Sequence, residues 1–121
     1  MDRSILLADD EDTLLRLFSH VLKRAGYATI SAASSTEAET LFAEHADEVG
    51  ALLLDVNLPP DGAEQVLATV SARSPELPVL IVSGKLLEGS LATEVQRRSN
   101  LHFLAKPFRP MELLAWVEAL P

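Results

Sequence analysis

The stretch ILLADDEDTLL, residues 5 to 15, passes from an apolar run directly into four consecutive acidic residues. The run Ser4–Ala8 has no polar alternation, which predicts a short strand buried inside a sheet. Four carboxylates in succession repel one another, so a buried strand that ends in them needs a chemical reason. The remainder of the chain indicates what that reason is.

Apolar runs alternate with amphipathic segments along the whole sequence. Strands are predicted at Ser4–Ala8, Tyr27–Ala33, Ala51–Asp55, Pro78–Val82 and Leu101–Leu104. Helices are predicted at Glu11–Ala25, from Ser34 or Thr36 to His45, at Ala63–Arg73, Ser90–Arg98 and Pro110–Leu120. Five βα units in a row predict an α/β fold, with a single parallel sheet covered by helices on both faces.

Local signals set the ends of some helices and leave one segment open. Asp12 is expected to cap the first helix and to favour its dipole. Gly26 is expected to stop the same helix, and Ser34 or Thr36 to cap the second. The segment Lys85–Gly89 begins beside one glycine and ends at another, and its structure stays open.

The composition predicts one soluble globular domain over residues 1–121. The chain is 48% hydrophobic, and its apolar runs are too short to cross a bilayer. It has no cysteine, which excludes disulfides and thiolate metal sites and is compatible with the cytoplasm. A formal net charge of −8 disfavours direct binding to nucleic acid or anionic membrane. Cations and basic protein surfaces are the expected partners.

Polar residues follow several of the predicted strands, and parallel strands end at the same edge of a sheet. Asp9 and Asp10 follow the first strand, Asp55 ends the third, Ser83 follows the fourth and Lys106 follows the fifth. If the first and third strands are neighbours, three carboxylates meet there and repel by roughly 1–4 kcal/mol per pair. A bound cation would relieve that repulsion. With oxygen ligands alone, Mg²⁺ or Mn²⁺ is expected.

The charges of such a site would also suit phosphate chemistry. Three carboxylates, a divalent cation and Lys106 sum to zero, so a dianionic phosphoryl group can approach. With cation and ammonium on the phosphoryl oxygens, one carboxylate can attack phosphorus.

With these residues in view, the chain resembles the receiver domain of bacterial two-component response regulators over its whole length. The residues that carry the resemblance are Asp9-Asp10, Asp55, Ser83 and Lys106-Pro107, with Pro59 and Gly62 in the turn after Asp55. The resemblance implies a doubly wound, flavodoxin-like sheet in the order 2-1-3-4-5, which chemotaxis receivers also have.

The resemblance also implies a role for each site residue. Asp55 would accept a phosphoryl group from a histidine kinase or a histidine phosphotransfer protein. Asp10 and Asp55 would bind Mg²⁺ together with the backbone carbonyl of Asn57, and Asp9 would position a metal-bound water. Lys106 would contact the phosphoryl oxygens. On this basis the protein catalyses only its own phosphorylation and dephosphorylation.

Two further residues hold the switch positions of the family. The hydroxyl of Ser83 would move toward the phosphoryl group, and Phe103 would then turn inward. The face made by the fourth helix, the fifth strand and the fifth helix would change its affinity for a downstream protein or fused domain. A homodimer formed on phosphorylation is among the outputs that the resemblance allows.

The match has departures. The turn from Asp55 to Gly62 is one residue shorter than is usual in the family. Phe103 replaces the commoner tyrosine, so switching there would act by packing alone. Gly84 leaves open access to the acceptor, and Lys85 could approach the phosphoryl group and change its lifetime.

Other functions remain open at this point. The same acids would suit a Mg²⁺-dependent phosphatase with an aspartate nucleophile, although such enzymes usually carry Asp-x-Asp after the first strand. A flavin-binding protein is disfavoured because the acidic tract would repel the flavin phosphate. An interaction module independent of phosphorylation would not need the acidic set. The chain could also be the receiver of a hybrid kinase or of a longer regulator.

Overall fold

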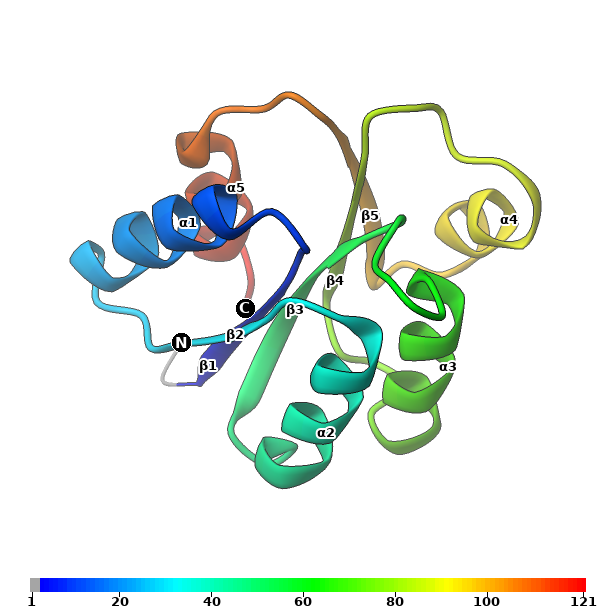
Figure 1. The fold of residues 1–121 in the computed structure, drawn as a ribbon, viewed down its shortest axis with the longest axis horizontal. Coiled ribbons are helices and arrows are strands. Elements are labelled where there is room, and N and C mark those ends of the chain that lie inside the picture. Colours follow the sequence, from blue (N-terminus) through cyan, green and yellow to red (C-terminus); the bar gives the residue numbers. More distant parts are fainter. Residues whose placement is uncertain (1–2) are drawn as a thin grey trace.

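The computed structural model describes residues 3–121, in which five strands and five helices alternate along the chain (Figure 1). The strands are β1 (Ser4–Ala8), β2 (Thr29–Ala32), β3 (Val49–Asp55), β4 (Val79–Ser83) and β5 (Leu101–Ala105). The helices are α1 (Asp12–Arg24), α2 (Ser35–His45), α3 (Ala63–Arg73), α4 (Gly89–Arg97) and α5 (Pro110–Glu118). No helix within residues 3–121 is long and apolar enough to cross a bilayer.

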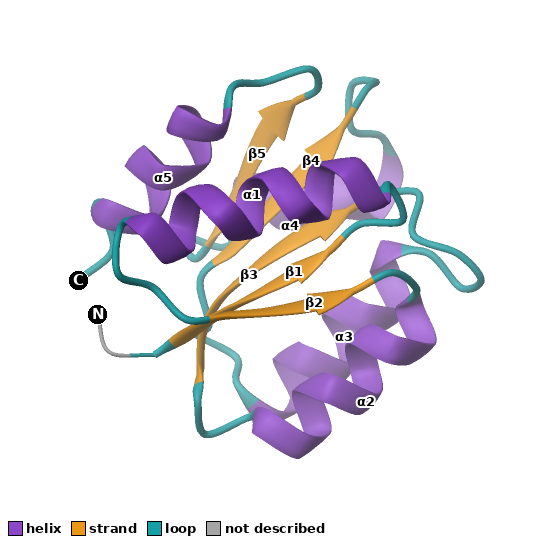
Figure 2. Ribbon diagram, turned by 60° about the vertical axis from the view of Figure 1, so that its left-hand side comes forward, coloured by secondary structure: helices purple, strands orange, loops and turns teal. Residues whose placement is uncertain are grey.

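The strands form one parallel sheet in the order β2-β1-β3-β4-β5, which confirms the predicted topology. The winding therefore reverses between β1 and β3. Helices α1 and α5 cover one face, and α2, α3 and α4 cover the other (Figure 2). In open α/β sheets, the carboxyl ends of the strands at such a reversal form the usual ligand crevice.

Strand β3 lies in the middle of the sheet and is sealed on both faces. Leu52 and Leu54 belong to the apolar cluster under α2, α3 and α4, whereas Ala51 and Leu53 belong to the cluster under α1 and α5. All four residues are 0% exposed. Burying each leucine contributes about 1.5–3 kcal/mol, so the strand that ends in Asp55 is firmly anchored.

The start of the first helix differs from the prediction. Asp12 is the first residue of α1 and Glu11 is its N-cap, so the expected capping role of Asp12 is wrong. Asp12 does place an acid in the first turn, where it pairs with Arg16 at 3.0 Å. By contrast, Ser34 caps α2 as predicted, because its Oγ accepts the Glu37 N–H at 3.0 Å.

Other element ends differ by a few residues. Strand β2 is shorter than predicted, and β3 begins at Val49 instead of Ala51 because the β1–β3 pairing shifts by one residue at Gly50. The segment left open by the sequence is a loop through Glu88. Helix α4 then begins at Gly89, whose φ of +61° is a conformation that glycine adopts readily.

Candidate functional site

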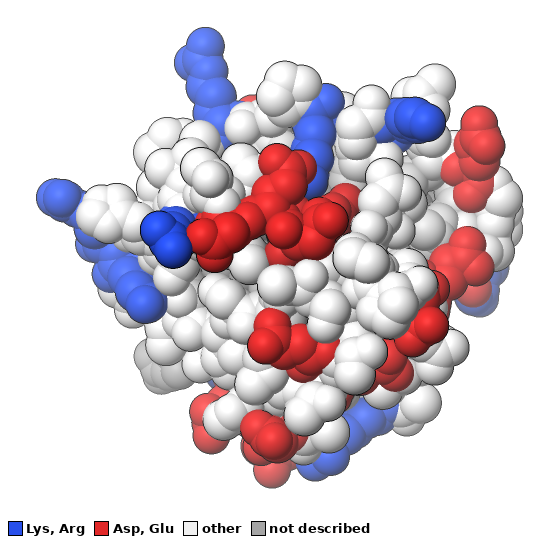
Figure 3. Space-filling model, in the orientation of Figure 1, with Lys and Arg blue, Asp and Glu red and all other residues white. Residues whose placement is uncertain are grey.

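The carboxyl ends of four strands bring the predicted polar residues to one rim of the sheet. Asp9 directly follows β1, Asp55 ends β3, Ser83 ends β4 and Lys106 directly follows β5. Figure 3 shows acidic side chains gathered over this rim beside a basic one. A cavity of about 690 Å³ lies at the opposite, amino-terminal end of the strands, and none of the predicted site residues lines it.

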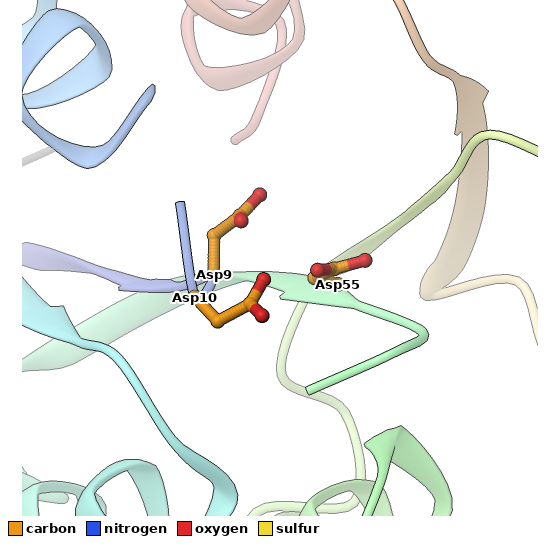
Figure 4. Close-up of side chains that lie close together, drawn as sticks. All are labelled: Asp9, Asp10 and Asp55. Carbon is orange, nitrogen blue, oxygen red and sulfur yellow. The ribbon is translucent and has the colours of Figure 1, made fainter. Parts of the chain in front are cut away.

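Three carboxylates meet at the rim. Asp9, Asp10 and Asp55 each offer an oxygen atom, and these atoms lie within 4.8 Å of one another (Figure 4). Asp9 and Asp55 are buried, whereas Asp10 is exposed, so the cluster is open to solvent on one side. Hard oxygen ligands at this spacing fit a divalent cation such as Mg²⁺ or Mn²⁺.

Asp9 is the most firmly held of the three acids. Its Oδ1 accepts the Glu11 N–H at 3.0 Å, and its Oδ2 accepts a hydrogen bond from Lys106 Nζ at 2.8 Å. Its side chain is 0% exposed, so both contacts replace water that the carboxylate has lost. Asp9 is therefore the buried member of the cluster whose two oxygens both have hydrogen-bond partners.

Asp55 is held more loosely. Its Oδ1 accepts the Asn57 N–H at 3.3 Å, the geometry of an Asx turn, and its Oδ2 lies 3.7 Å from Lys106 Nζ. The second distance is too long for a hydrogen bond but short enough for strong attraction. Among the contacts of residues 3–121, Oδ2 of Asp55 therefore accepts no short hydrogen bond.

Burial and crowding shift the protonation of this group. Burial raises the pKa of Asp55 above 3.8, the charge of Asp9 raises it further, and Lys106 and the Asn57 N–H lower it only in part. Burial acts to lower the pKa of Lys106, but its hydrogen bond to Asp9 and the nearby carboxylates outweigh burial and raise it above 10.5. Lys106 alone therefore does not neutralise the three carboxylates. A bound cation would supply the remaining positive charge.

Ser83 and Phe103 lie along the neighbouring strands β4 and β5. Ser83 is 4% exposed; its Oγ accepts the Lys85 N–H at 3.1 Å, and its carbonyl accepts the Lys106 N–H at 2.8 Å. Phe103 is half-buried, pairs with Ile81 in the sheet and packs against the apolar cluster under α4. Ser83 thus belongs to the rim, whereas Phe103 lies two residues before the end of β5.

The turn after Asp55 is compact. The Gly62 N–H donates to the Leu58 carbonyl at 2.7 Å, and Gly62 has a φ of +81°. Asn57 is exposed and meets Asp55 through its backbone N–H. The predicted role of the Asn57 carbonyl as a metal ligand stays a prediction.

Sequence reasoning missed Glu11 as an individual residue of the site. Its Oε1 lies 3.3 Å from Lys106 Nζ, and it lines a groove of about 480 Å³ beside that lysine. Apolar side chains complete the groove, including Phe18 and Phe108, whose rings stack at 5.2 Å. The available signal was the position of Glu11 in the short acidic connection between the first strand and the first helix.

Comparison with known proteins places the chain in one family. A family model described as the response regulator receiver domain matches residues 5–118. The alginate biosynthesis transcriptional regulatory protein AlgB of Pseudomonas putida is 32% identical over 109 residues, 90% of this chain and 24% of that protein. The alkaline phosphatase synthesis transcriptional regulatory protein PhoP of Bacillus subtilis is 28% identical over 120 residues, 99% of this chain and 49% of that protein.

Solved structures show the same fold. The chemotaxis protein CheY4 of Vibrio cholerae aligns over the whole of both chains with a TM-score of 0.85 and 24% identity. A response regulator receiver protein of Sinorhizobium medicae has a TM-score of 0.79 and 26% identity, covering 96% of this chain and 91% of that one.

The chain spans about a quarter to a half of the length of the two curated relatives named above. The family model covers residues 5–118, so the similarity of this chain to these relatives lies in the receiver domain. Receiver domains are the phosphorylation-dependent signalling modules of two-component systems. The chain belongs to the response regulator receiver domain family.

Proposed function

We propose that Asp55 accepts a phosphoryl group from a phosphohistidine of a histidine kinase or phosphotransfer protein, and that this modification changes the affinity of the domain for a partner. The observation that carries the proposal is the position of Asp55. It ends the central strand at the rim, beside two further carboxylates and 3.7 Å from the ammonium of Lys106.

The reaction needs few groups from the protein. An oxygen of Asp55 attacks phosphorus, and the bond between phosphorus and the donor nitrogen breaks with its electron pair on the imidazole. Lys106 approaches the phosphoryl oxygens and balances their charge. Hydrolysis of the resulting acyl phosphate returns the carboxylate, so the protein promotes only its own phosphorylation and dephosphorylation.

The carboxylates of Asp10 and Asp55 would hold Mg²⁺, or Mn²⁺ in its place, together with the carbonyl of Asn57. Asp9, fixed by Lys106 and the Glu11 N–H, would orient water on the ion. The ion supplies the positive charge that lets a phosphoryl dianion approach three acids.

Ser83 and Phe103 would pass the change to the α4–β5–α5 face. In this structure the Ser83 hydroxyl accepts the Lys85 N–H, and phosphorylation would turn it toward Asp55. The loop that follows is bounded by Gly84 and Gly89 and carries Leu86, which is 85% exposed. Phe103 packs beneath α4, so its movement would alter that face.

The wider setting follows from the same reading. Residues 1–121 would form one receiver domain that acts in the cytoplasm. Its partners would be the phosphodonor protein and a downstream protein or fused domain, with homodimerisation on phosphorylation as one output. The two relatives are transcriptional regulatory proteins, but the −8 charge of this chain disfavours its own binding to DNA.

The test uses beryllofluoride, an acyl-phosphate analogue, with Mg²⁺. Amide NMR signals should shift around Asp55, Ser83 and Phe103, and Asp55→Asn should show no such response. Phosphotransfer profiling against candidate histidine kinases would then identify the donor. An unchanged spectrum of the folded wild-type protein at saturating reagent would refute the proposal.

A further inference from the structure

Lys106 has two carboxylate partners that are closer than the proposed acceptor. Its Nζ lies 2.8 Å from Asp9 Oδ2 and 3.3 Å from Glu11 Oε1, but 3.7 Å from Asp55 Oδ2. Asp9 belongs to the carboxylate cluster, whereas Glu11 does not. The side chain of Glu11 is 59% exposed and that of Lys106 only 15%, so Glu11 approaches the lysine from the solvent side.

The backbone holds Glu11 in this place. Glu11 is the N-cap of α1, and its N–H donates to Asp9 Oδ1 at 3.0 Å. Glu11 therefore fixes Oδ1 of Asp9 through its backbone N–H. Its side chain contacts Lys106, which donates to the other oxygen of Asp9, Oδ2. Its contact with Lys106 spans 95 positions of sequence and joins the first and last strand ends of the rim.

We propose that Glu11 is a positioning residue that holds Lys106 back from Asp55 and so slows phosphorylation of the acceptor. The inference rests on the proposed function of Asp55. Lys106 must contact the incoming phosphoryl oxygens, and each contact that it keeps with another carboxylate opposes that movement. Glu11 thereby limits the rate at which a small-molecule phosphodonor, which makes no protein–protein contacts, phosphorylates Asp55.

The roles of the two competing acids differ once the site is loaded. With a cation bound in the cluster, the negative charge of Asp9 would be partly neutralised, and Asp9 would attract Lys106 less strongly. Glu11 lies outside the cluster and would keep its full charge. It would therefore remain the main competitor for the lysine, and its exposed charge would also repel a dianionic donor at the entrance.

The test compares Glu11→Gln, which keeps the shape and removes the charge, with the wild-type protein. Acetyl phosphate is the donor, free Mg²⁺ is saturating for each variant, and phosphorylated protein is separated by phosphate-affinity electrophoresis. Exposed ion pairs of this kind change equilibria by about two- to five-fold, so the rate constant should rise about two- to five-fold. In about 1 M salt the difference should nearly vanish.

An equilibrium readout separates positioning from a general structural effect. Beryllofluoride should bind Glu11→Gln about two- to five-fold more tightly than wild type at saturating Mg²⁺, by amide NMR titration. Glu11→Ser is a second variant that removes the charge and places a preferred N-cap residue at the start of α1, and it should behave in the same way. If Glu11→Gln folds poorly, Glu11→Ser alone decides the comparison.

Asp12→Asn is the matched control. It also removes one negative charge from the same helix start, but its carboxylate pairs with Arg16 at 3.0 Å, not with Lys106. Its rate and its beryllofluoride affinity should stay within about 1.5-fold of wild type. An equal gain in Asp12→Asn, or an unchanged or slower reaction in both Glu11 variants, would overturn the inference alone. A wild-type protein that neither accepts phosphate nor binds beryllofluoride would overturn the proposed function as well.

Discussion

Lys106 and Asp9 form a partly buried ion pair, with Nζ 2.8 Å from Oδ2, although 97 positions separate them in the sequence. The pair joins the end of the first strand to the end of the last. It also holds the ammonium of Lys106 closer to Asp9 than to the proposed acceptor, Asp55.

Lys106→Met should destabilise the protein by about 2–4 kcal/mol, because it leaves the Asp9 carboxylate buried with a lost partner. Urea unfolding at pH 7 measures the effect, with Lys23→Met on the exposed end of α1 as control. Since the pKa of Lys106 is raised in the folded state, its contribution should be complete below 10.5 and fall as pH rises through the raised pKa. An equal loss in the Lys23 variant would contradict the assignment.

Asp55→Asn should stabilise the metal-free protein at pH 7, by roughly 1 kcal/mol, since it removes one of the repelling charges. The raised pKa of Asp55 means that the folded protein binds this proton more tightly than the unfolded chain does. The wild type should therefore recover stability as pH falls through that raised pKa, and the advantage of the variant should shrink. Urea unfolding in EDTA at two pH values tests this. Asp47→Asn, whose carboxylate is 98% exposed, should show no such gain.

Mg²⁺ should raise the stability of the wild-type protein. The wild type should then be more stable than Asp55→Asn, the reverse of the order expected in EDTA. At free Mg²⁺ about ten times its Kd, binding to the native state adds about 1.4 kcal/mol. Asp10→Asn and Asp55→Asn should lose most of this stabilisation, whereas Asp47→Asn should retain it. Thermal unfolding with and without Mg²⁺ provides the measurement. The same gain in all four proteins would mean that the ion binds elsewhere.

Ser83→Ala should uncouple the acceptor from the α4–β5–α5 face. The hydroxyl that accepts the Lys85 N–H is lost, at a cost of about 1 kcal/mol or less in stability. With beryllofluoride and Mg²⁺, amide shifts around Asp55 should remain while those around Phe103 fade. Ser83→Thr keeps the hydroxyl and should restore the distant shifts. Full shifts at Phe103 in the alanine variant would show that the signal takes another route.

Much of the fold follows from local patterns in the sequence. Unbroken apolar runs such as Leu52–Leu54 predicted central strands, and the order of units predicted the parallel sheet. Strand ends were harder to predict because pairing with neighbours decides them. The shift at Gly50, which lengthens β3, depends on β1 and leaves no local signal.

The composition of the site was also predictable, since each polar residue directly follows an apolar run. The distances within it were not. That Lys106 lies closer to Asp9 and Glu11 than to Asp55 depends on how two loops, 95 and more positions apart, settle against each other. Glu11 and Asp12 look equivalent as letters, yet the helix start directs one toward Lys106 and the other toward Arg16.

The ion pair between Asp9 and Lys106 has a consequence for biosynthesis. A ribosome releases the first strand long before it has made the residue that neutralises Asp9, and closing so long a loop is slow and entropically costly. A nascent chain that stops short of β5 would present the acids with no lysine opposite them. If Lys106 acts as proposed, we therefore expect uptake of phosphate only once β5 and the residue after it have been made.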